Sequence, residues 1–380
     1  MKFQSKLPEV ENSIFAVMSQ KATEYGAVNL SQGFPNFDTD PKLLDLACYY
    51  IKKGFNQYAP MPGVHELRKA IVNKHTLCQN VPYDSDTEIT ITAGATQAIA
   101  TAVTTVVCPG DEVIVFEPTY DAYEPLVKLQ GGKIVPIELK FPDFKPDWDE
   151  VKNAISVNTR AIIINTPHNP CGSILGKDDL DSLAEILKDT DILVISDEVY
   201  EHIVFDGLQH ISLSYHPELR KRSFIISSFG KTLHTTGWKI GYCLAPESLT
   251  SEFRKAHQFI VYAVNTPVQY AIAEYIKDPN SYNSVSPFYE KKRDLSEKLL
   301  LQTSFKPSKT FGTYFQLIDY SHTPFNTGFE ITEKLVKENG IALIPLEPFY
   351  KKFKAPKLIR VCFAKKDETL EDGLKNLIGI

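Results

Sequence analysis

Short apolar segments that recur along the first two thirds of the chain constrain its fold more than any other feature. They span residues 89–92, 113–116, 161–164, 192–195 and 224–226. Each is rich in residues that favour strands and shows almost no alternation of apolar and polar positions, which is typical of strands covered on both faces. The sequence therefore predicts a buried and mainly parallel sheet.

Helical periodicity appears in the intervals between these segments. Residues 95–107 carry apolar side chains at the spacing of one helix face, and so do Leu180, Leu183 and Leu187 ahead of the fourth segment. Strands that alternate with helices favour parallel pairing with right-handed connections. We therefore predict an α/β fold whose large domain is a mainly parallel sheet flanked by helices.

The pattern changes after about residue 287. Strand-like runs at 314–317, 341–344 and 358–363 then alternate with helical stretches, which favours a smaller α/β domain. The start of the chain instead resembles an arm, because residues 30–37 are rich in turn-forming and aromatic residues. The predicted division is an N-terminal arm over 1–40 that packs with the small domain, a large domain over 41–285, and a small C-terminal domain over 286–380.

Charge and cysteine content exclude several classes of protein. The formal net charge of -6 argues against nucleic acid or an anionic membrane as the main partner. No apolar run approaches the roughly 20 residues that span a bilayer, and the first residues do not resemble a signal peptide. The six cysteines form no C-x-x-C pair, and the nine histidines show no zinc-ligand spacing. We therefore expect a cytoplasmic protein without a disulfide framework or a metal site.

Polar residues follow the apolar segments where the predicted strands end. Ligands of open parallel sheets bind beyond the carboxyl ends of the strands, so these residues are candidates for one site. Gly94, Ala95 and Thr96 follow the first segment and open a helix. Backbone N–H groups and the positive end of a helix dipole suit a phosphate there, although a plain turn is the alternative.

The remaining strand ends offer a ring, an amide, a carboxylate and an amine. Tyr120 would stack on a flat ring or pack in the core, and Asn169 lies in a stiff, proline-rich loop. Asp197 directly follows a buried strand, where a carboxylate needs a cationic ring nitrogen, an arginine or a helix N-terminus. Lys231 lies in a Ser- and Gly-rich turn, where desolvation can free an amine to attack a carbonyl; a surface lysine is the alternative.

Together these groups are the parts that hold pyridoxal phosphate, and their order resembles a known family. The motifs are G-A-T at 94–96, N-P-C-G at 169–172, D-E-V-Y at 197–200 and S-F-G-K at 228–231, with Tyr120, Lys239 and Arg360. The chain is similar, over nearly its whole length, to fold-type I pyridoxal-phosphate aminotransferases of class I. Q-G-F-P at 32–35 and N-Q-Y-A-P at 56–60 narrow the resemblance to the kynurenine/glutamine transaminase branch and its bacterial methionine aminotransferases.

The resemblance implies roles around the cofactor ring. It implies that Lys231 carries pyridoxal phosphate covalently and moves the proton during catalysis. Asp197 would hold the ring nitrogen, and Tyr120 would stack on the ring. Asn169 and Tyr200 would bind the phenolic oxygen of the ring, and Tyr200 is counted with Lys231 and Asp197 as catalytic.

The resemblance also implies binding sites for phosphate and substrate. The predicted phosphate ligands are Gly94, Ala95, Thr96, Ser228, Lys239 and Tyr58 of the partner subunit. Lys239 stands where many relatives have arginine and Ala95 where some have glycine. Gly33, Asn169 and Arg360 would bind the substrate, with Arg360 on its α-carboxylate. The bonds Glu117–Pro118 and Asn169–Pro170 resemble peptide bonds that are cis in the family.

The function implied is an aminotransferase that acts as a homodimer with shared active sites. It would move the amino group of an apolar, sulfur-containing or aromatic amino acid to a 2-oxo acid. A carbon–sulfur β-lyase that acts on cysteine conjugates is the alternative on the same fold. A pyridoxal-phosphate-binding transcription regulator is disfavoured, because the arm leaves no room for a preceding DNA-binding domain.

Overall fold

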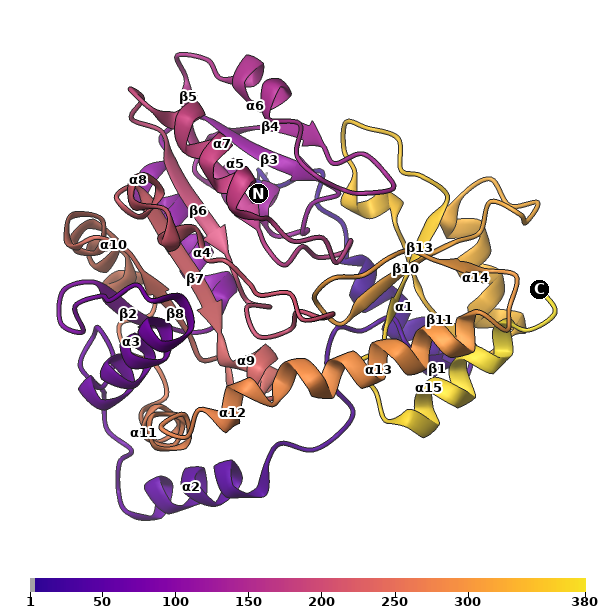
Figure 1. Ribbon diagram of the computed structural model, residues 1–380, viewed down its shortest axis with the longest axis horizontal. Coiled ribbons are helices and arrows are strands. Elements are labelled where there is room, and N and C mark those ends of the chain that lie inside the picture. The colour runs from indigo at the N-terminus through magenta and orange to yellow at the C-terminus, as the bar shows by residue number, and fades with distance from the viewer. Residues whose placement is uncertain (1–3) are drawn as a thin grey trace.

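A seven-stranded sheet forms the centre of the larger part of the chain in the computed structural model, which describes residues 4–380 (Figure 1). The strand order is β2-β8-β7-β6-β5-β3-β4. Its strands are β2 (Ile89–Thr92), β3 (Glu112–Glu117), β4 (Lys133–Glu138), β5 (Thr159–Asn165), β6 (Leu193–Asp197), β7 (Ser223–Ser228) and β8 (Gly241–Leu244). Neighbouring strands are parallel, except that β8 is antiparallel to both β7 and β2. The predicted mainly parallel sheet is confirmed, while β4 and β8 were not foreseen.

Both faces of this sheet are covered by helices, which explains why its strands show no alternation in sequence. In β5, Ala161 and Ile163 face a cluster with Ile99 of α4, whereas Ile162 and Ile164 belong to the cluster on the other face. The helices of this part are α2 (Pro41–Lys52), α3 (His65–Gln79), α4 (Ala95–Val106), α5 (Tyr123–Leu129), α6 (Trp148–Ala154), α7 (Lys177–Leu187), α8 (Pro217–Arg220), α9 (Phe229–Thr232), α10 (Glu247–Ile260), α11 (Thr266–Tyr275) and α12 (Asn280–Asn283), with short 3₁₀ turns η1 (Leu213–Tyr215) and η2 (Thr236–Trp238).

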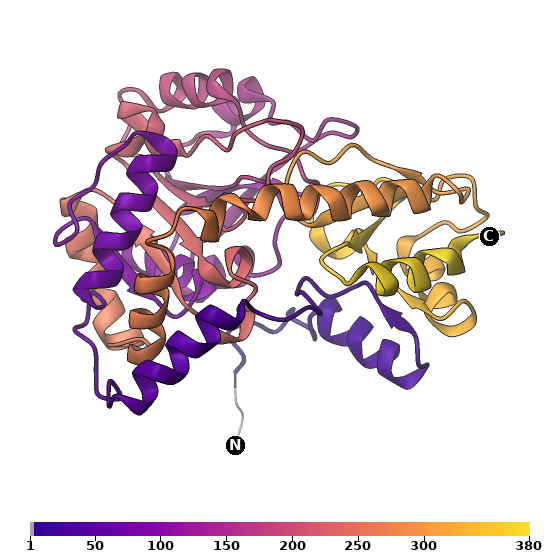
Figure 2. The same ribbon diagram turned by 60° about the horizontal axis from the view of Figure 1, so that its bottom comes forward.

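A second, antiparallel sheet of order β12-β13-β10-β9 forms the core of the smaller part. Its strands are β9 (Lys306–Pro307), β10 (Phe315–Asp319), β12 (Ile344–Pro345) and β13 (Leu358–Cys362). The helices here are α13 (Val285–Leu300), α14 (Gly328–Glu338) and α15 (Asp367–Leu374), with 3₁₀ turns η3 (Glu347–Phe349) and η4 (Lys375–Leu377). Helix α13 runs from the larger part to the smaller one (Figure 2).

The N-terminal segment lies against the smaller part. It contains α1 (Ile14–Glu24) and β1 (Val28–Asn29), and β1 pairs in parallel with β11 (Ile341–Ala342). The backbone N–H of Cys362 also donates to the carbonyl of Leu30. The domain boundaries after residues 40 and 285 remain a prediction.

Two further features of the chain bear on the earlier expectations. The peptide bonds Glu117–Pro118 and Asn169–Pro170 are cis, as the resemblance implied, and so are Phe141–Pro142 and Thr166–Pro167. Each helix within residues 4–380 is too short or too polar to cross a membrane.

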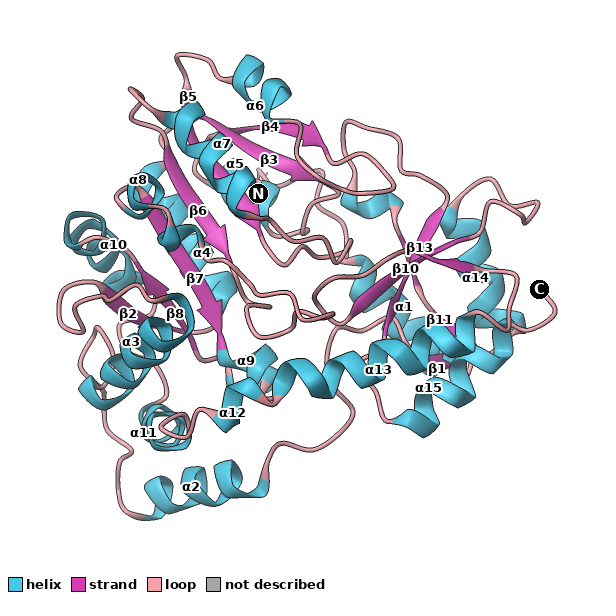
Figure 3. Cartoon of the chain, in the orientation of Figure 1, coloured by secondary structure: helices cyan, strands magenta, loops and turns pink. Residues whose placement is uncertain are grey.

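The arrows of β6 and β7 point to the loops between the two sheets, where the strand-end residues gather (Figure 3).

Gly241 allows β8 to lie close to the start of α4. A Cβ atom added at Gly241 would lie 2.8 Å from the carbonyl carbon of Gly94, 2.8 Å from the carbonyl oxygen of Ser227 and 2.9 Å from the backbone nitrogen of Ala95. Two of these backbone atoms belong to the predicted phosphate ligands Gly94 and Ala95, and the third belongs to Ser227, the residue before the predicted ligand Ser228. A side chain at this position would therefore push apart the elements that form the site.

We predict that Gly241→Ala lowers the free energy of unfolding by about 1–3 kcal/mol, because the methyl group has no space among these backbone atoms. Urea unfolding followed by circular dichroism measures the change. Gly237→Ala is the matched control, since a Cβ atom there meets nothing within 4 Å. Equal stability of the two variants would show that the backbone around Gly241 yields easily.

Candidate active site

A cavity of about 260 Å³ lies at the carboxyl ends of β3, β5, β6 and β7. It brings together residues that are far apart in the chain. The predicted site residues that line it are Gly33, Ala95, Thr96, Tyr120, Asn169, Asp197, Tyr200, Ser228, Lys231, Lys239 and Arg360. The remaining lining residues are Phe15, Gln32, Ile99, Asn165, Val199, Gly230, Thr236 and Phe315.

Two predicted site residues do not line this cavity. Gly94 lies directly behind it as the residue before α4, with a φ of 78°, and an added Cβ atom would come within 3.1 Å of Nζ of Lys239. Tyr58 is 84% exposed and packs edge-on against Tyr262, with 5.5 Å between the ring centroids. Tyr58 was predicted to bind the phosphate in the active site of the partner subunit. A single chain does not contain that site, so this role remains a prediction.

Lys231 follows β7 in a short helical turn whose N-cap is Ser228. The Ser228 hydroxyl accepts a hydrogen bond from the backbone N–H of Gly230 at 3.2 Å, which fixes the turn. Nζ of Lys231 donates to the hydroxyl of Tyr314 at 2.8 Å and to the carbonyl oxygen of Gly33 at 3.3 Å. Burial lowers the pKa of Lys231 to about 8. About a tenth of this amine is then neutral at pH 7, far more than for an ordinary lysine, and the neutral form is the one that acts as a nucleophile or base.

Asp197 is the last residue of β6, and its carboxylate is buried without an ion pair among residues 4–380. The hydroxyl of Tyr123 donates to Oδ2 at 2.6 Å, and the backbone N–H of Val199 donates to Oδ1 at 3.3 Å. Burial raises the pKa of Asp197 to about 6, although these two hydrogen bonds act in the opposite direction. Neither the arginine nor the helix N-terminus considered as an alternative partner is bonded to it, so the site fits a cationic ligand group.

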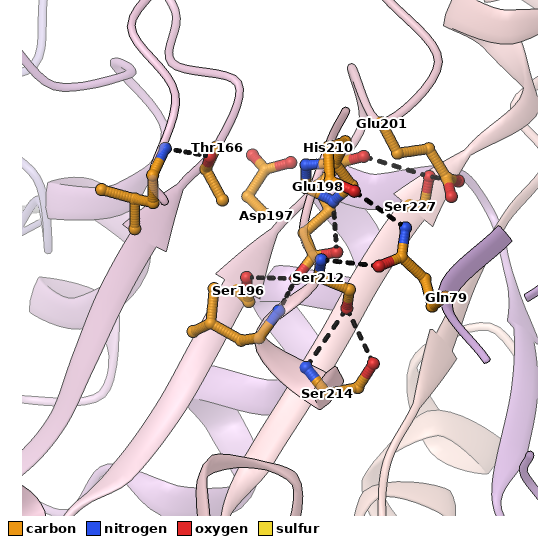
Figure 4. A network of polar contacts seen from close by, with 12 residues as sticks. Gln79, Thr166, Ser196, Asp197, Glu198, Glu201, His210, Ser212, Ser214 and Ser227 are labelled. Carbon is orange, nitrogen blue, oxygen red and sulfur yellow. Dashed lines mark hydrogen bonds and ion pairs between the residues drawn. The ribbon is translucent and has the colours of Figure 1, made fainter. Parts of the chain in front are cut away.

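The backbone next to Asp197 is fixed by a buried polar network (Figure 4). The adjacent Glu198 accepts from the hydroxyl of Ser196 at 2.8 Å and from the backbone N–H of Leu213 at 3.1 Å, and its other oxygen pairs with Nε2 of His210 at 2.8 Å. Successive strand residues point to opposite faces, so this network holds the strand end from the side away from the Asp197 carboxylate. The side chain of Asn165 also donates to the Asp197 carbonyl, at 2.9 Å.

A second buried carboxylate, Glu201, connects the ends of neighbouring strands. It accepts from the hydroxyls of Ser227 and Tyr242, each at 2.6 Å, and pairs with Nζ of Lys74 at 2.8 Å. Burial alone would raise the pKa of Glu201, but Lys74 and these donors hold it well below its usual value. The segment after β6 is thereby tied to β7, β8 and α3, which stabilises the strand ends that carry the site.

The part of the cavity beside the start of α4 is suited to a ligand group with two negative charges. Ala95 and Thr96 occupy the first turn of α4, where backbone N–H groups are free of helical partners. Lys239 contributes a cation there, and the hydroxyl of Ser228 faces the same cavity. The backbone of Lys239 is in the left-handed region, at a φ of 55°. These groups fit the phosphate of pyridoxal phosphate, and Tyr120 supplies an aromatic ring beside them.

Arg360 lies on β13 and is almost fully buried, at 1% exposure. One guanidinium nitrogen donates to Oδ1 of Asn169 at 2.9 Å and the other to the carbonyl of Ser31 at 3.0 Å, while Nε has no hydrogen-bond partner among the described residues. Its charge lies 3.8 Å from the centroid of the Phe315 ring and 4.9 Å from that of Phe15. Burial lowers the pKa of Arg360 to about 10, so it stays charged at neutral pH. A buried guanidinium without a carboxylate partner fits an anionic ligand.

Several residues of the site had no recognisable sequence signal. Tyr123 lies three residues after Tyr120, on α5, and nothing in the sequence indicated its bond to Asp197. Phe15 and Tyr314 come from the arm and from the residue before β10, where they read as ordinary core aromatics. Arg254, on α10, does not line this cavity, because its guanidinium donates to the hydroxyl of Thr90 and to the carbonyl oxygen of Ile89 on β2.

Known aminotransferases match this chain over nearly its whole length. The family model for aminotransferases of class I and II matches residues 25–377. A methionine aminotransferase of Escherichia coli is 44% identical over 97% of this chain and 95% of its own length. A solved structure from Escherichia coli, described as having a methionine aminotransferase function, aligns with all of both chains at 43% identity and a TM-score of 0.98. The structure of N-succinyldiaminopimelate aminotransferase from Mycobacterium tuberculosis aligns with 99% of both chains at 37% identity and a TM-score of 0.95.

We predict that the affinity for pyridoxamine phosphate falls as the pH is lowered through about 6, because protonated Asp197 no longer attracts a cationic ring nitrogen. Asp197 is ionised above that pH and neutral below it, so the loss lies on the acid side. Titration calorimetry at pH 5 to 8 measures the dissociation constants. The ligand's own phosphate also titrates near pH 6, so Asp197→Asn serves as the matched control.

The wild-type protein should bind roughly tenfold or more tightly than Asp197→Asn at pH 8, and the difference should shrink towards pH 5. Parallel curves for the two proteins would mean that Asp197 does not interact with the charged ring.

Proposed function

The chain belongs to the family of class I and II aminotransferases, which use pyridoxal phosphate, and we propose that its amino donors are apolar, sulfur-containing and aromatic amino acids, methionine among them. The observation that carries this proposal is the setting of Arg360, a buried cation placed among phenyl rings. The methionine aminotransferase of Escherichia coli, at 44% identity, supports the same donor class.

In this proposal different residues of the cavity bind different parts of the cofactor. Bound pyridoxal phosphate would supply an aldehyde carbon that carries the amino group from donor to acceptor, and a ring that withdraws electrons from the reacting atoms. The start of α4, Ser228 and Lys239 hold its phosphate, and Asp197 holds the ring nitrogen in its protonated form. Lys231 binds the cofactor covalently, and when its amine is free it takes the proton from Cα of the donor.

Arg360 fixes the donor in the proposed complex. Its guanidinium binds the α-carboxylate, because a planar cation in a dry site matches a carboxylate with two parallel hydrogen bonds. The bond from Arg360 to Asn169 sets the orientation of that guanidinium. Asn169 also lines the cavity beside Tyr200, where both are suited to the phenolic oxygen of the ring. The backbone of Gly33 completes the carboxylate site.

The rest of the cavity sets the proposed donor preference. The cations that line it within residues 4–380 are Lys231, Lys239 and Arg360, and each already has a ligand in this scheme. Phe15, Phe315 and Ile99 are the large apolar side chains that remain. A second carboxylate on the donor would lose its water without gaining a partner, which costs several kcal/mol. The kcat/KM values of donors that differ by one methylene group should differ by only about 10- to 200-fold.

We propose that the active unit is a homodimer in which Tyr58 binds the cofactor phosphate of the partner subunit. This proposal is supported by a cluster of exposed aromatic residues on the single chain. Tyr58, Phe259 and Tyr262 are 84%, 86% and 51% exposed. Large exposed apolar side chains that gather on one surface mark contacts with another protein.

We predict that kcat/KM for methionine exceeds that for aspartate by at least about 100-fold, because the aspartate side chain has no cationic partner in the cavity. Arg360→Ala should lower kcat/KM for methionine, leucine and phenylalanine by a similar factor of about 100, since all share the α-carboxylate. Coupled assays with a fixed 2-oxo acid measure both effects. Equal use of aspartate and methionine would refute this account of the pocket.

Arg254→Ala is the control for this experiment, because Arg254 bonds to β2 and should leave the methionine-to-aspartate ratio unchanged. The alternative β-lyase activity is measured in parallel with a cysteine conjugate and no oxo acid. Steady release of ammonia and pyruvate faster than transamination would favour elimination as the main reaction.

We predict that mixing inactive Lys231→Ala with inactive Tyr58→Ala restores activity, because a hybrid dimer contains one site with both residues intact. Random exchange of subunits should recover about a quarter of the wild-type sites. A mixture of Lys231→Ala with Asp197→Asn is the control and should stay inactive, since both residues belong to the same chain's site. No recovery despite demonstrated subunit exchange would exclude a shared site.

A further inference from the structure

Tyr314 lies directly behind Lys231, at the junction of three parts of the chain. It precedes β10 of the smaller sheet and is fully buried, at 0% exposure. Its hydroxyl lies 2.8 Å from Nζ of Lys231, which follows β7 of the larger sheet. The same hydroxyl bonds to the carbonyl oxygen of Gly33 in the N-terminal segment. We propose that Tyr314 is a positioning residue, which holds the free amine of Lys231 with its lone pair directed into the cavity.

The direction of each hydrogen bond in this group is fixed by its chemistry. A phenol carries one proton, and Tyr314 donates it to the carbonyl oxygen of Gly33. Burial raises the pKa of Tyr314 well above its usual value of 10.0, so the phenol keeps that proton. Towards Lys231 the hydroxyl therefore acts only as an acceptor, and it does not compete for the lone pair of the amine.

The two acceptors match the two protons of a neutral amine. Nζ of Lys231 donates to Tyr314 at 2.8 Å and to Gly33 at 3.3 Å. A neutral amine has two N–H bonds and one lone pair in a tetrahedral arrangement, so both N–H bonds are used. Lys231 and Gly33 line the cavity, whereas Tyr314 lies behind it. With its two N–H bonds directed to these two acceptors, the amine is inferred to point its lone pair into the cavity. That orientation is required to attack a carbonyl or to accept a proton there.

The ring of Tyr314 is held so that its hydroxyl cannot turn away. Its centroid lies 5.3 Å from that of Tyr200, 4.9 Å from that of Phe315 and 5.6 Å from that of Tyr289. Its own backbone carbonyl accepts from the N–H of Phe363 at 3.0 Å. Aromatic packing on several sides restricts the ring to one orientation.

The test compares Tyr314→Phe with Tyr289→Phe in the full-length protein freed of cofactor, and it rests on Lys231 being the cofactor lysine, as proposed above. Tyr289 is the matched control, because it is equally buried, packs on Tyr314 and has a hydroxyl without a hydrogen-bond partner within residues 4–380. The rate of covalent attachment of pyridoxal phosphate is followed by absorbance. Pyridoxamine phosphate, which lacks the aldehyde, reports the affinity of the site without the covalent step. Borohydride reduction and peptide mapping identify the lysine.

We expect Tyr314→Phe to attach pyridoxal phosphate about tenfold more slowly than the wild-type protein, because its amine has lost one acceptor. Its affinity for pyridoxamine phosphate should stay within about twofold of wild type, and Tyr289→Phe should match wild type in both measurements. Attachment at the wild-type rate would overturn the role of Tyr314, and so would an equal loss of rate and affinity or an equal effect in Tyr289→Phe. An adduct on a lysine other than Lys231 would overturn the cofactor assignment together with this proposal, whereas an adduct on Lys231 with an unchanged rate overturns the proposal alone.

Discussion

Burial of charged side chains at one edge of the large sheet is the constraint on which the rest of the structure depends. Asp197, Lys231 and Arg360 all line one cavity, and burial shifts the pKa of each in the direction that favours its neutral form. An unpaired charge in such a place is costly unless hydrogen bonds or a ligand compensate it. The three groups are therefore only partly satisfied by the protein, and in the function proposed above their partners are a cationic ring nitrogen, a carbonyl and a carboxylate.

The polar networks behind the cavity give these groups fixed positions. Glu198 is buried and the side chain of Glu201 is only 7% exposed, both on the same stretch as Asp197, and each has several donors of its own. Their hydrogen bonds join strand ends, a helix and a loop that are distant in sequence. Removing one of these carboxylates would leave buried donors without acceptors, so the networks hold the strand ends in one arrangement.

Much of this site was predictable from sequence because a parallel sheet brings the ends of its strands together. Once the apolar segments were identified as buried strands, Tyr120, Asn169, Asp197 and Lys231 had to lie at one edge. Tyr123 and Tyr314 follow no such rule, because a helix residue and a residue before a distant strand reach the cavity only through tertiary packing. The sequence did not predict the antiparallel strand β8, because its four residues carry no pattern that distinguishes them from any other short buried run. Tyr58 faces a second chain in the proposal, and a single chain cannot place it.

Helix α13 is a stiff connection between the two parts of the molecule. Its 16 residues extend about 24 Å as one rigid rod between the two sheets. Such a rod does not bend easily, so any rotation between the two parts has to occur at its ends, and a small angle there becomes a larger displacement at the far end. Arg360 and Tyr314 would travel with the smaller sheet while Lys231 stays with the larger one. The distance between the amine and the phenol would therefore change with any such rotation.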